Sequence, residues 1–315
     1  MKRRSILAPG IGLAVAALVA LAGCGKATDS AAPAAAPAAP KTLAFSILSA
    51  EDQASYEPLW RPLLDDLSKA VGMPVKPFFS SNYTALVQAM RFNQVQLGWF
   101  SAEPALETID RAEGQVFART ADLDGKDTYT SVILVKKGSG LTLDKILKCD
   151  RTLSFGMGDP NSTSGTLAPK AFLFKPRKVD PNTCFKVVRS ATHAANLFSV
   201  ANGVLDASTN NSVGLDFALK GAPEAKRAYD NVQVAWTSPP LPESAIVYRK
   251  DLDPALRDKI RNFFLTYGKA PGAEGERQKA IMAKLHYTSF NAADDSYLQP
   301  IRDMRAATAP AGAAG

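Results

Sequence analysis

Three consecutive hydroxyl side chains stand between a predicted strand and a predicted helix. Ser162, Thr163 and Ser164 precede Gly165 in the segment GDPNSTSG, residues 158–165. Three kinds of chemistry use hydroxyls at such a junction. One hydroxyl can cap the helix, a serine can act as a nucleophile, or several hydroxyls can donate to a bound anion.

The nucleophile is the least favoured of these interpretations. A catalytic serine needs a general base and a third group that orients the base. His193 is a candidate base, but the chain has no G-x-S-x-G turn, so a secreted Ser/His hydrolase is only a remote alternative. A cap uses one hydroxyl and leaves two unexplained. Three hydroxyls beside the unpaired amides of a helix N-terminus can surround a tetrahedral anion, so the cap and the anion site both remain open.

The hydrophobic pattern predicts alternating strands and helices. Apolar residues alternate in strands and recur every three or four residues in helices. The predicted strands are 43–48, 75–79, 94–100, 129–136, 152–156, 185–189, 204–208, 232–237 and 245–249. The predicted helices are 59–70, 83–91, 104–113 (ended by Gly114), 193–202, 254–267 and 274–285, with another that begins at Thr166.

This order predicts two α/β lobes with mostly parallel sheets, joined by two crossings of the chain. One lobe comprises 42–130 and 245–306, and the other comprises 131–244. Ligands of parallel sheets bind beyond the carboxyl ends of strands, where helix N-termini point. We therefore expect the site at the polar junctions 49–52, 80–84, 100–104, 159–166, 190–193, 209–212 and 238–244.

The N-terminal residues predict export. Lys2, Arg3 and Arg4 precede a short apolar run, so residues 1–23 read as a secretory signal peptide. The segment Leu21-Ala22-Gly23-Cys24 resembles the bacterial lipoprotein pattern, which predicts a lipid on Cys24 and anchoring in the periplasm or at the cell surface. An ordinary signal peptide with an incidental cysteine is the alternative. Residues 24–41 then read as an Ala/Pro tether, and 307–315 as a disordered tail.

The net charge argues against a nucleic-acid partner. The net charge of +7 falls by three to +4 without the cations of the signal peptide. The remaining cations are scattered, so we expect no nucleic-acid partner.

The two cysteines that remain after Cys24 are predicted to pair. In an oxidising compartment, Cys149 and Cys184 are predicted to form a disulfide, with two free thiols as the alternative. His193 and His286 do not lie at ligand spacing from a cysteine, so neither a metal nor another cofactor is expected.

Five segments resemble the phosphonate-binding proteins of ABC transporters, whose ligands include phosphite and related oxyanions. These segments are 78–100, 114–118, 155–169 (FGMGDPNSTSGTLAP), 191–211 (ATHAANLFSVANGVLDASTNN) and 236–242. The resemblance implies a type II periplasmic-binding-protein fold with a hinge and no enzymatic activity. It also implies that the PO3 group is held by Ser162, Thr163, Ser164, His193 and Tyr83. The partners would be a permease and its ATPase, with the binding protein as a monomer; a lipoprotein that presents the anion to a receptor is the alternative.

The chain departs from the family pattern where an amine of the ligand would lie. Two positions differ: family members that bind aminoalkylphosphonates carry acidic residues where this chain has Val213 and Ser244. Val213 follows Asn211 and Ser212 in the chain. Phe100 replaces a usual tyrosine. We therefore predict a phosphonate, phosphite or phosphate that lacks an amine, against an alternative of sequence drift with an unchanged ligand. Glu243 and Glu51 are weaker candidates for a compensating carboxylate, Glu243 only if its loop rotates.

Overall fold

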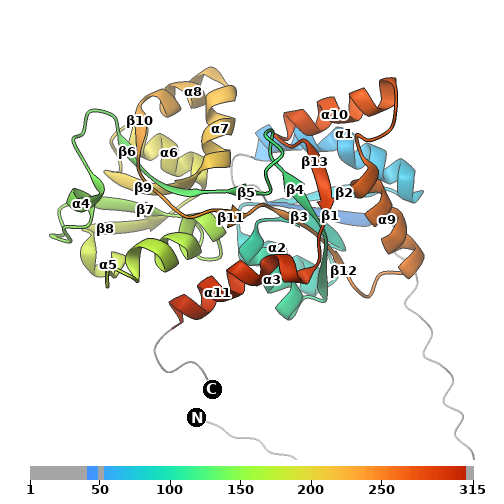
Figure 1. Ribbon diagram of the computed structural model, residues 1–315, viewed down its shortest axis with the longest axis horizontal. Helices are drawn as coiled ribbons and strands as arrows, with labels where there is room; N and C mark the ends of the chain where they lie inside the picture. Colours follow the sequence, from blue (N-terminus) through green and yellow to red (C-terminus); the bar gives the residue numbers. More distant parts are fainter. Residues whose placement is uncertain (1–40, 49–52, 310–315) are drawn as a thin grey trace, which may run out of the picture. The chain divides into compact units, whose positions relative to one another are not determined.

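The computed structural model describes residues 41–48 and 53–309 of the 315-residue chain. These residues form two large β-sheets, each flanked by helices (Figure 1). The predicted signal peptide, residues 24–40 of the predicted tether (Cys24 included), and Glu51 lie outside the described residues. No described helix combines the length and the apolar character that crossing a membrane would require.

The first sheet has six strands in the order β13-β4-β12-β3-β1-β2. Its strands are β1 (Leu43–Leu48), β2 (Val75–Ser80), β3 (Leu97–Phe100), β4 (Gly114–Ala121), β12 (Ala245–Arg249) and β13 (Ser289–Ala292). The strands β2, β1 and β3 are parallel, as predicted. The return strand β12 runs antiparallel between β3 and β4, so the sheet is mixed rather than mostly parallel.

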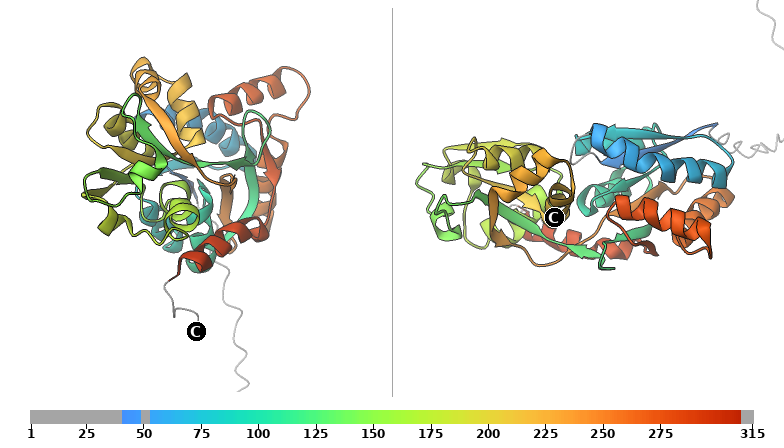
Figure 2. Two further views of the ribbon diagram at one scale, coloured as in Figure 1. Left: turned by 60° about the vertical axis from the view of Figure 1, so that its left-hand side comes forward. Right: turned by 90° about the horizontal axis from the view of Figure 1, so that it is seen from above.

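The second sheet has five strands in the order β10-β6-β9-β7-β8. Its strands are β6 (Ser131–Lys136), β7 (Ser154–Met157), β8 (Val187–Ser190), β9 (Ala207–Asn211) and β10 (Val232–Thr237). The strands β8, β7 and β9 are parallel, whereas β6 and β10 are antiparallel additions. The short strands β5 (Thr128–Tyr129) and β11 (Leu241–Pro242) pair with each other in the two segments that connect the sheets (Figures 1 and 2).

Helices cover both sheets because their apolar faces pack on the strands. Those associated with the first sheet are α1 (Gln53–Val71), α2 (Tyr83–Arg91), α3 (Ala102–Arg111), α9 (Pro254–Thr266), α10 (Ala273–Lys284) and α11 (Gln299–Thr308), the last preceded by the 3-10 turn η3 (Asp295–Leu298). Those associated with the second sheet are α4 (Leu143–Ile146), α5 (Pro181–Cys184), α6 (His193–Ala201), α7 (Ser212–Lys220) and α8 (Pro223–Asp230), with the π-helical segments η1 (Thr163–Leu167) and η2 (Lys170–Phe174).

Several predicted boundaries were wrong. Gly114 does not end α3 but begins β4, and the left-handed residue there is Glu113 with φ of 55°. Gly114 is required for another reason: a Cβ would lie 2.5 Å from Thr108 Oγ1. The strand predicted at 204–208 begins at Ala207, because Val204 and Leu205 bond back to the end of α6.

The C-terminal region and the stretch after β9 contain elements that the hydrophobic pattern did not reveal. The chain does not finish with α10, since β13 and α11 follow it. Because α11 extends to Thr308, the predicted tail begins inside a helix. The helices α7 and α8 were also missed. They have only nine and eight residues, so each spans little more than two helical turns and offers few repeats of an apolar pattern.

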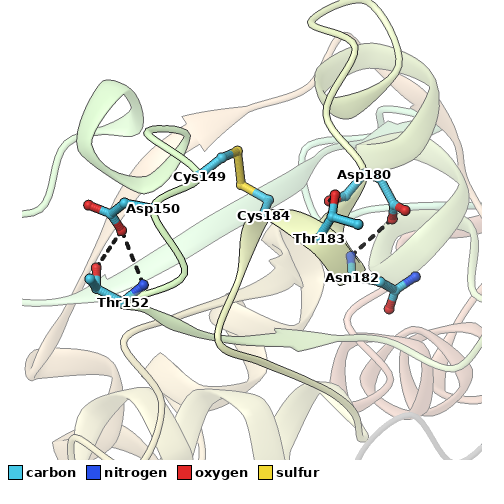
Figure 3. Close-up of a disulfide and its surroundings, with 7 residues drawn as sticks. All are labelled: Cys149, Asp150, Thr152, Asp180, Asn182, Thr183 and Cys184. Carbon is cyan, nitrogen blue, oxygen red and sulfur yellow. Dashed lines mark hydrogen bonds between the residues drawn. A yellow bond between two sulfur atoms is a disulfide. The ribbon is translucent and has the colours of Figure 1, made fainter.

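The predicted disulfide between Cys149 and Cys184 is confirmed (Figure 3). It links the turn after α4 to the end of α5, over a sequence separation of 35 residues. Cys184 is buried with Phe155 and Phe185 in the apolar cluster of the second sheet. The bridge therefore fastens the loops at one end of that sheet rather than the junctions expected to hold a ligand.

Candidate functional site

A small cavity lies between residues of the two sheets, at the junctions that follow the strands. Every described junction named from the sequence contributes to its wall. The lining residues are Leu48, Tyr56, Tyr83, Trp99, Ser101, Tyr129, Ser162, Ser164, His193, Asn211, Val213, Gly214, Glu243, Ser244 and Tyr287. The cavity volume is about 50 Å³. One water needs about 10–15 Å³ of such free space, so the cavity suits a ligand of few heavy atoms.

The hydroxyl turn is both a helix cap and part of the cavity wall. Ser162 Oγ accepts the N–H of Gly165 at 3.0 Å, which caps η1. The hydroxyl hydrogen of Ser162 is not used in that bond, and Ser162 and Ser164 both line the cavity. The two interpretations left open by the sequence are therefore compatible in this geometry.

Gly165 packs against Gly158, the glycine at the other end of the motif. A Cβ on Gly158 would lie 2.7 Å from Gly165 Cα, and the N–H of Gly158 donates to the carbonyl of Gly165 at 2.9 Å. The two glycines that bracket the motif thus hold the turn in place by close backbone contact.

Thr163 bonds across to the first sheet instead of lining the cavity. Its Oγ1 accepts the N–H of Glu103, in the first turn of α3, at 2.8 Å. A second bond between the same regions runs from Asn161 Nδ2 to Thr84 Oγ1, at 3.0 Å. Among the described residues that line the cavity, Thr163 is absent. Its hydroxyl joins the two sides of the site.

His193 begins α6 and is almost fully buried beside the hydroxyl turn. Its Nε2 lies 3.4 Å from Ser164 Oγ. Burial lowers the pKa of His193 to about 4, so the imidazole is neutral at pH 7. Its Nδ1 is buried with no hydrogen-bond partner in the described part of the chain. A neutral imidazole carries one N–H donor, and His193 lines the same cavity as the Ser162 and Ser164 hydroxyls.

Glu243 is a buried carboxyl group in the same wall, without any loop rotation. Its Oε2 accepts the N–H of Ser244 at 2.9 Å and lies 3.3 Å from Thr120 Oγ1, which donates to it. Its Oε1 is buried and has no hydrogen-bond partner among residues 41–48 and 53–309. Burial raises the pKa of Glu243 to about 7. Glu243 is thus the titratable carboxyl group of the cavity at neutral pH.

Aromatic residues that the sequence reasoning missed complete the wall. Tyr129 and Tyr287 line the cavity, and burial raises the pKa of each phenol, so both remain protonated donors at neutral pH. Tyr129 belongs to the β-branched run that was interpreted only as a strand. Trp99 lines the cavity, whereas the neighbouring Phe100 does not appear among its described lining residues. Because successive strand residues face opposite sides, Phe100 is directed into the core instead.

The remaining predicted residues have mixed placements. Tyr83, Asn211, Val213 and Ser244 line the cavity, as expected for a shared site. Asn211 also caps α7, because its side chain accepts the N–H of Gly214 at 2.7 Å. The sequence thus predicted about half of the lining residues, and it gave no signal for Tyr129 and Tyr287 because they carry no local motif.

Two α/β units around a small polar cavity define a substrate-binding protein of the type II periplasmic fold. The chain matches the family described as ABC transporter, phosphonate, periplasmic substrate-binding protein over residues 45–298, and it belongs to that family. It is 40% identical to the phosphonates-binding periplasmic protein of Escherichia coli K12, over 84% of this chain and 76% of that protein. A probable phosphite-binding protein from Prochlorococcus marinus is 26% identical, over 68% of this chain and 72% of that protein.

Solved structures agree with this assignment of fold. The binding-protein component of a phosphonate ABC transporter from Pseudomonas aeruginosa has a TM-score of 0.79 and 36% identity, and the match covers 84% of this chain and 85% of that one. A Prochlorococcus marinus protein solved with methylphosphonate has a TM-score of 0.72 at 23% identity, covering 84% of this chain and 97% of that one. The Escherichia coli relative is named as a periplasmic binding protein, and the Pseudomonas aeruginosa and probable phosphite-binding relatives as binding proteins of ABC transporters.

Proposed function

We propose that this protein captures a phosphonate and delivers it to the permease of an ABC importer, without chemical change. The observation that carries the proposal is the meeting of Ser162, Ser164, His193 and Tyr83 in one small buried cavity. Family membership and the 40% identity to a phosphonate-binding protein support the same ligand class. The alternative is a lipoprotein that binds the same ligand but presents it to a receptor instead of a permease.

The hydroxyl turn and His193 would hold the PO3 group. Hydrogen bonds to a charged group contribute roughly 1.5–3 kcal/mol each. Micromolar affinity needs about 8 kcal/mol after association costs. Four such bonds, from the Ser162 and Ser164 hydroxyls, the His193 imidazole and the Tyr83 hydroxyl, would contribute roughly 6–12 kcal/mol before those costs, which is the scale that micromolar affinity requires. The aromatic side chains around them would exclude water and strengthen each bond.

Glu243 changes our expectation for the rest of the ligand. The prediction of an amine-free ligand depended on Val213 and Ser244 replacing carboxylates. The buried, unpartnered Oε1 of Glu243 in the same cavity removes that reason. An ionised Glu243 beside a bound PO3 dianion would be repulsive unless a cationic group lay between them. We therefore propose a phosphonate whose substituent carries an ammonium group, with the amine-free phosphonate, phosphite or phosphate as the second candidate.

Ligand capture would proceed by closure of two lobes, the first comprising residues 42–130 and 245–306 and the second comprising 131–244. The chain crosses between the sheets twice, at 122–130 and 238–244, and these segments would form the hinge. Bonds such as Glu103 N–H to Thr163 Oγ1 would form as the lobes close. A lipid on Cys24 and the Ala/Pro tether would keep the monomeric protein at a membrane surface within reach of the permease.

Isothermal titration tests both the function and the ligand class. The titrants are 2-aminoethylphosphonate, methylphosphonate, phosphite, phosphate and sulfate. We expect the aminoethyl compound to bind most tightly, with a Kd in the micromolar range or below. Tightest binding of methylphosphonate or phosphite would retain the phosphorus site but reject the cationic substituent. Absence of heat from every phosphorus compound would reject the proposed function itself.

A matched pair of variants locates the binding. Ser164→Ala removes a hydroxyl from the cavity wall, whereas Ser199→Ala removes one from α6 away from the cavity lining. We expect only the first to weaken phosphonate binding. Equal loss in both variants would indicate general destabilisation rather than a role of the turn in the site.

A further inference from the structure

His286 joins two regions that belong to different sheets. It lies in the loop between α10 and β13, beside the first sheet, and contacts Asp216 of α7, a helix that packs on the second sheet. Its backbone is left-handed, with φ of 63°, a conformation that few non-glycine residues adopt. The imidazole is therefore presented to α7 from a tightly turned loop.

Two different interactions fix the imidazole on α7. His286 Nδ1 lies 2.6 Å from Asp216 Oδ2. The imidazole also stacks on the ring of Phe217, with ring centroids 3.7 Å apart and an interplanar angle of 17°. A hydrogen bond and a stacked ring together define both the position and the tilt of the imidazole, which a single surface ion pair would not do.

The hydrogen bond is of the neutral-imidazole type at neutral pH. Burial lowers the pKa of His286, and Lys220 adds to this effect, although Asp216 acts in the opposite direction. An ionised carboxylate only accepts, so Nδ1 carries the hydrogen. Lys220 Nζ lies 2.7 Å from Asp216 Oδ1 and 2.8 Å from Oδ2, so the lysine and the imidazole share the Asp216 carboxylate. Asp122, Asp124 and Glu243 are the remaining acidic groups of the outer pocket that His286 and Lys220 also line.

The contact borders the cavity without forming its wall. The next residue, Tyr287, lines the cavity, and so does Val213, one helical turn before Phe217. Phe217 stacks in turn on Tyr56, a cavity-lining residue of α1, with ring centroids 5.6 Å apart. Neither His286 nor Phe217 is among the described residues that line the cavity. His286 and Phe217 are therefore one contact removed from the groups that would touch a ligand.

We propose that His286, Asp216 and Phe217 form a clasp that holds the two lobes closed and slows ligand release. The proposal rests on the lobe closure in the proposed function. An interaction made only when the lobes are closed shifts the closed–open equilibrium by its own free energy. A ligand held between closed lobes would leave after they open, so the clasp would act on the dissociation rate more than on the initial encounter.

The test measures release and closure separately. Stopped-flow displacement of 2-aminoethylphosphonate gives the dissociation rate, and small-angle X-ray scattering of the ligand-free protein gives the radius of gyration. For His286→Ala we expect release roughly tenfold faster, with an association rate changed less than about twofold. The ligand-free protein should also have a larger radius of gyration, because the open form becomes more populated.

Further variants separate the clasp from general stability. Lys226→Ala breaks the Lys226–Asp230 ion pair. Both residues of that pair belong to α8, so the variant should leave the rate of ligand release unchanged. Phe217→Tyr keeps the stacked ring and should retain slow release, whereas Phe217→Ala should lose it. His286→Ala and Asp216→Ala should be non-additive in a double-mutant cycle. Each comparison uses variants whose melting temperatures are measured in parallel.

Two outcomes would overturn the clasp. One is a His286→Ala protein with a lower melting temperature but unaltered release and radius of gyration, since that result describes a purely structural contact. The other is additivity of the His286 and Asp216 variants. If the unmodified protein binds no phosphonate, the proposed function fails, but the ligand-free scattering still tests the clasp on its own.

Discussion

His193 Nε2 lies 3.4 Å from Ser164 Oγ, and these two side chains come from different strand–helix junctions of the second sheet. The parallel strands β7 and β8 end side by side, which brings the two following turns together. The contact therefore joins the hydroxyl turn and the N-terminus of α6 into one wall of the cavity. Two of our predictions concern this pair.

The pKa of His193 should rise when a phosphonate binds. Burial holds it at about 4 in the ligand-free protein, and a nearby dianion favours the charged imidazolium. NMR titration of the imidazole C–H signals, with and without 2-aminoethylphosphonate, measures both values. Only two histidines exist in the chain, so a His286→Gln variant assigns the signals. An unchanged pKa on saturation with ligand would place His193 outside the site.

Ser164→Ala should weaken phosphonate binding by about 10- to 100-fold, because a bond to a charged group contributes roughly 1.5–3 kcal/mol. Ser162→Ala should show two effects, since Ser162 also caps η1. Its unfolding free energy should fall by about 1 kcal/mol, the usual effect of losing a cap. Titration calorimetry and urea unfolding separate these contributions. If both variants bind the phosphonate as tightly as the unmodified protein does, the turn only caps the helix.

The ligand affinity should depend on pH because of Glu243, and the sign of that dependence distinguishes the two candidate ligand classes. The raised pKa of about 7 means that the carboxyl group is protonated below pH 7 and ionised above it. An ammonium-bearing ligand needs the ionised form, so its affinity should rise as pH increases through 7. An amine-free anion needs the protonated form, so its affinity should fall over the same range. Calorimetric titrations from pH 5.5 to 8.5 measure both slopes.

The control for this dependence is Glu243→Gln, which cannot ionise. Titration of the ligand and of other groups persists in the variant, so the difference between the two profiles isolates Glu243. We expect the variant to lose at least tenfold in affinity for 2-aminoethylphosphonate at pH 8 and much less for methylphosphonate. Equal losses for the two ligands would argue against contact between Glu243 and the substituent.

Removing the disulfide should affect stability and leave binding intact. A Cys149→Ser, Cys184→Ser variant should lose about 3–4 kcal/mol of unfolding free energy, given the 35-residue separation in the chain-entropy account. Neither cysteine lines the cavity. Denaturant unfolding and ligand titration of the variant check this prediction. The same two measurements are made on the unmodified protein under oxidising and reducing conditions. A large change in Kd would mean that the bridge shapes the site after all.

Much of the site could be predicted from local sequence because it is built at junctions. Apolar alternation and helical periodicity located β1, β7 and α6, and the polar residues after each strand then had to meet at one edge of a sheet. In this way the sequence predicts that Ser162, Ser164 and His193 share one wall. The disulfide followed from the number of cysteines in an exported chain.

Long-range pairing decided the rest. Tyr287 follows α10 in sequence but reaches the cavity because β13 pairs with β4, a register that no local pattern encodes. Glu243 was expected to need a rotated loop, yet the pairing of β11 with β5 and the bonds from Ser244 and Thr120 set its carboxyl group in the cavity wall.

The sequence by itself determined the alternating α/β elements, the hydroxyl turn and the family resemblance, because these depend on side-chain type and short spacing. Only the tertiary structure decided which carboxyl group enters the cavity, that Thr163 bonds to α3, and that His286 contacts Phe217. Those facts depend on contacts between residues far apart in the chain. Such contacts arise from the packing of whole elements, which local composition does not specify.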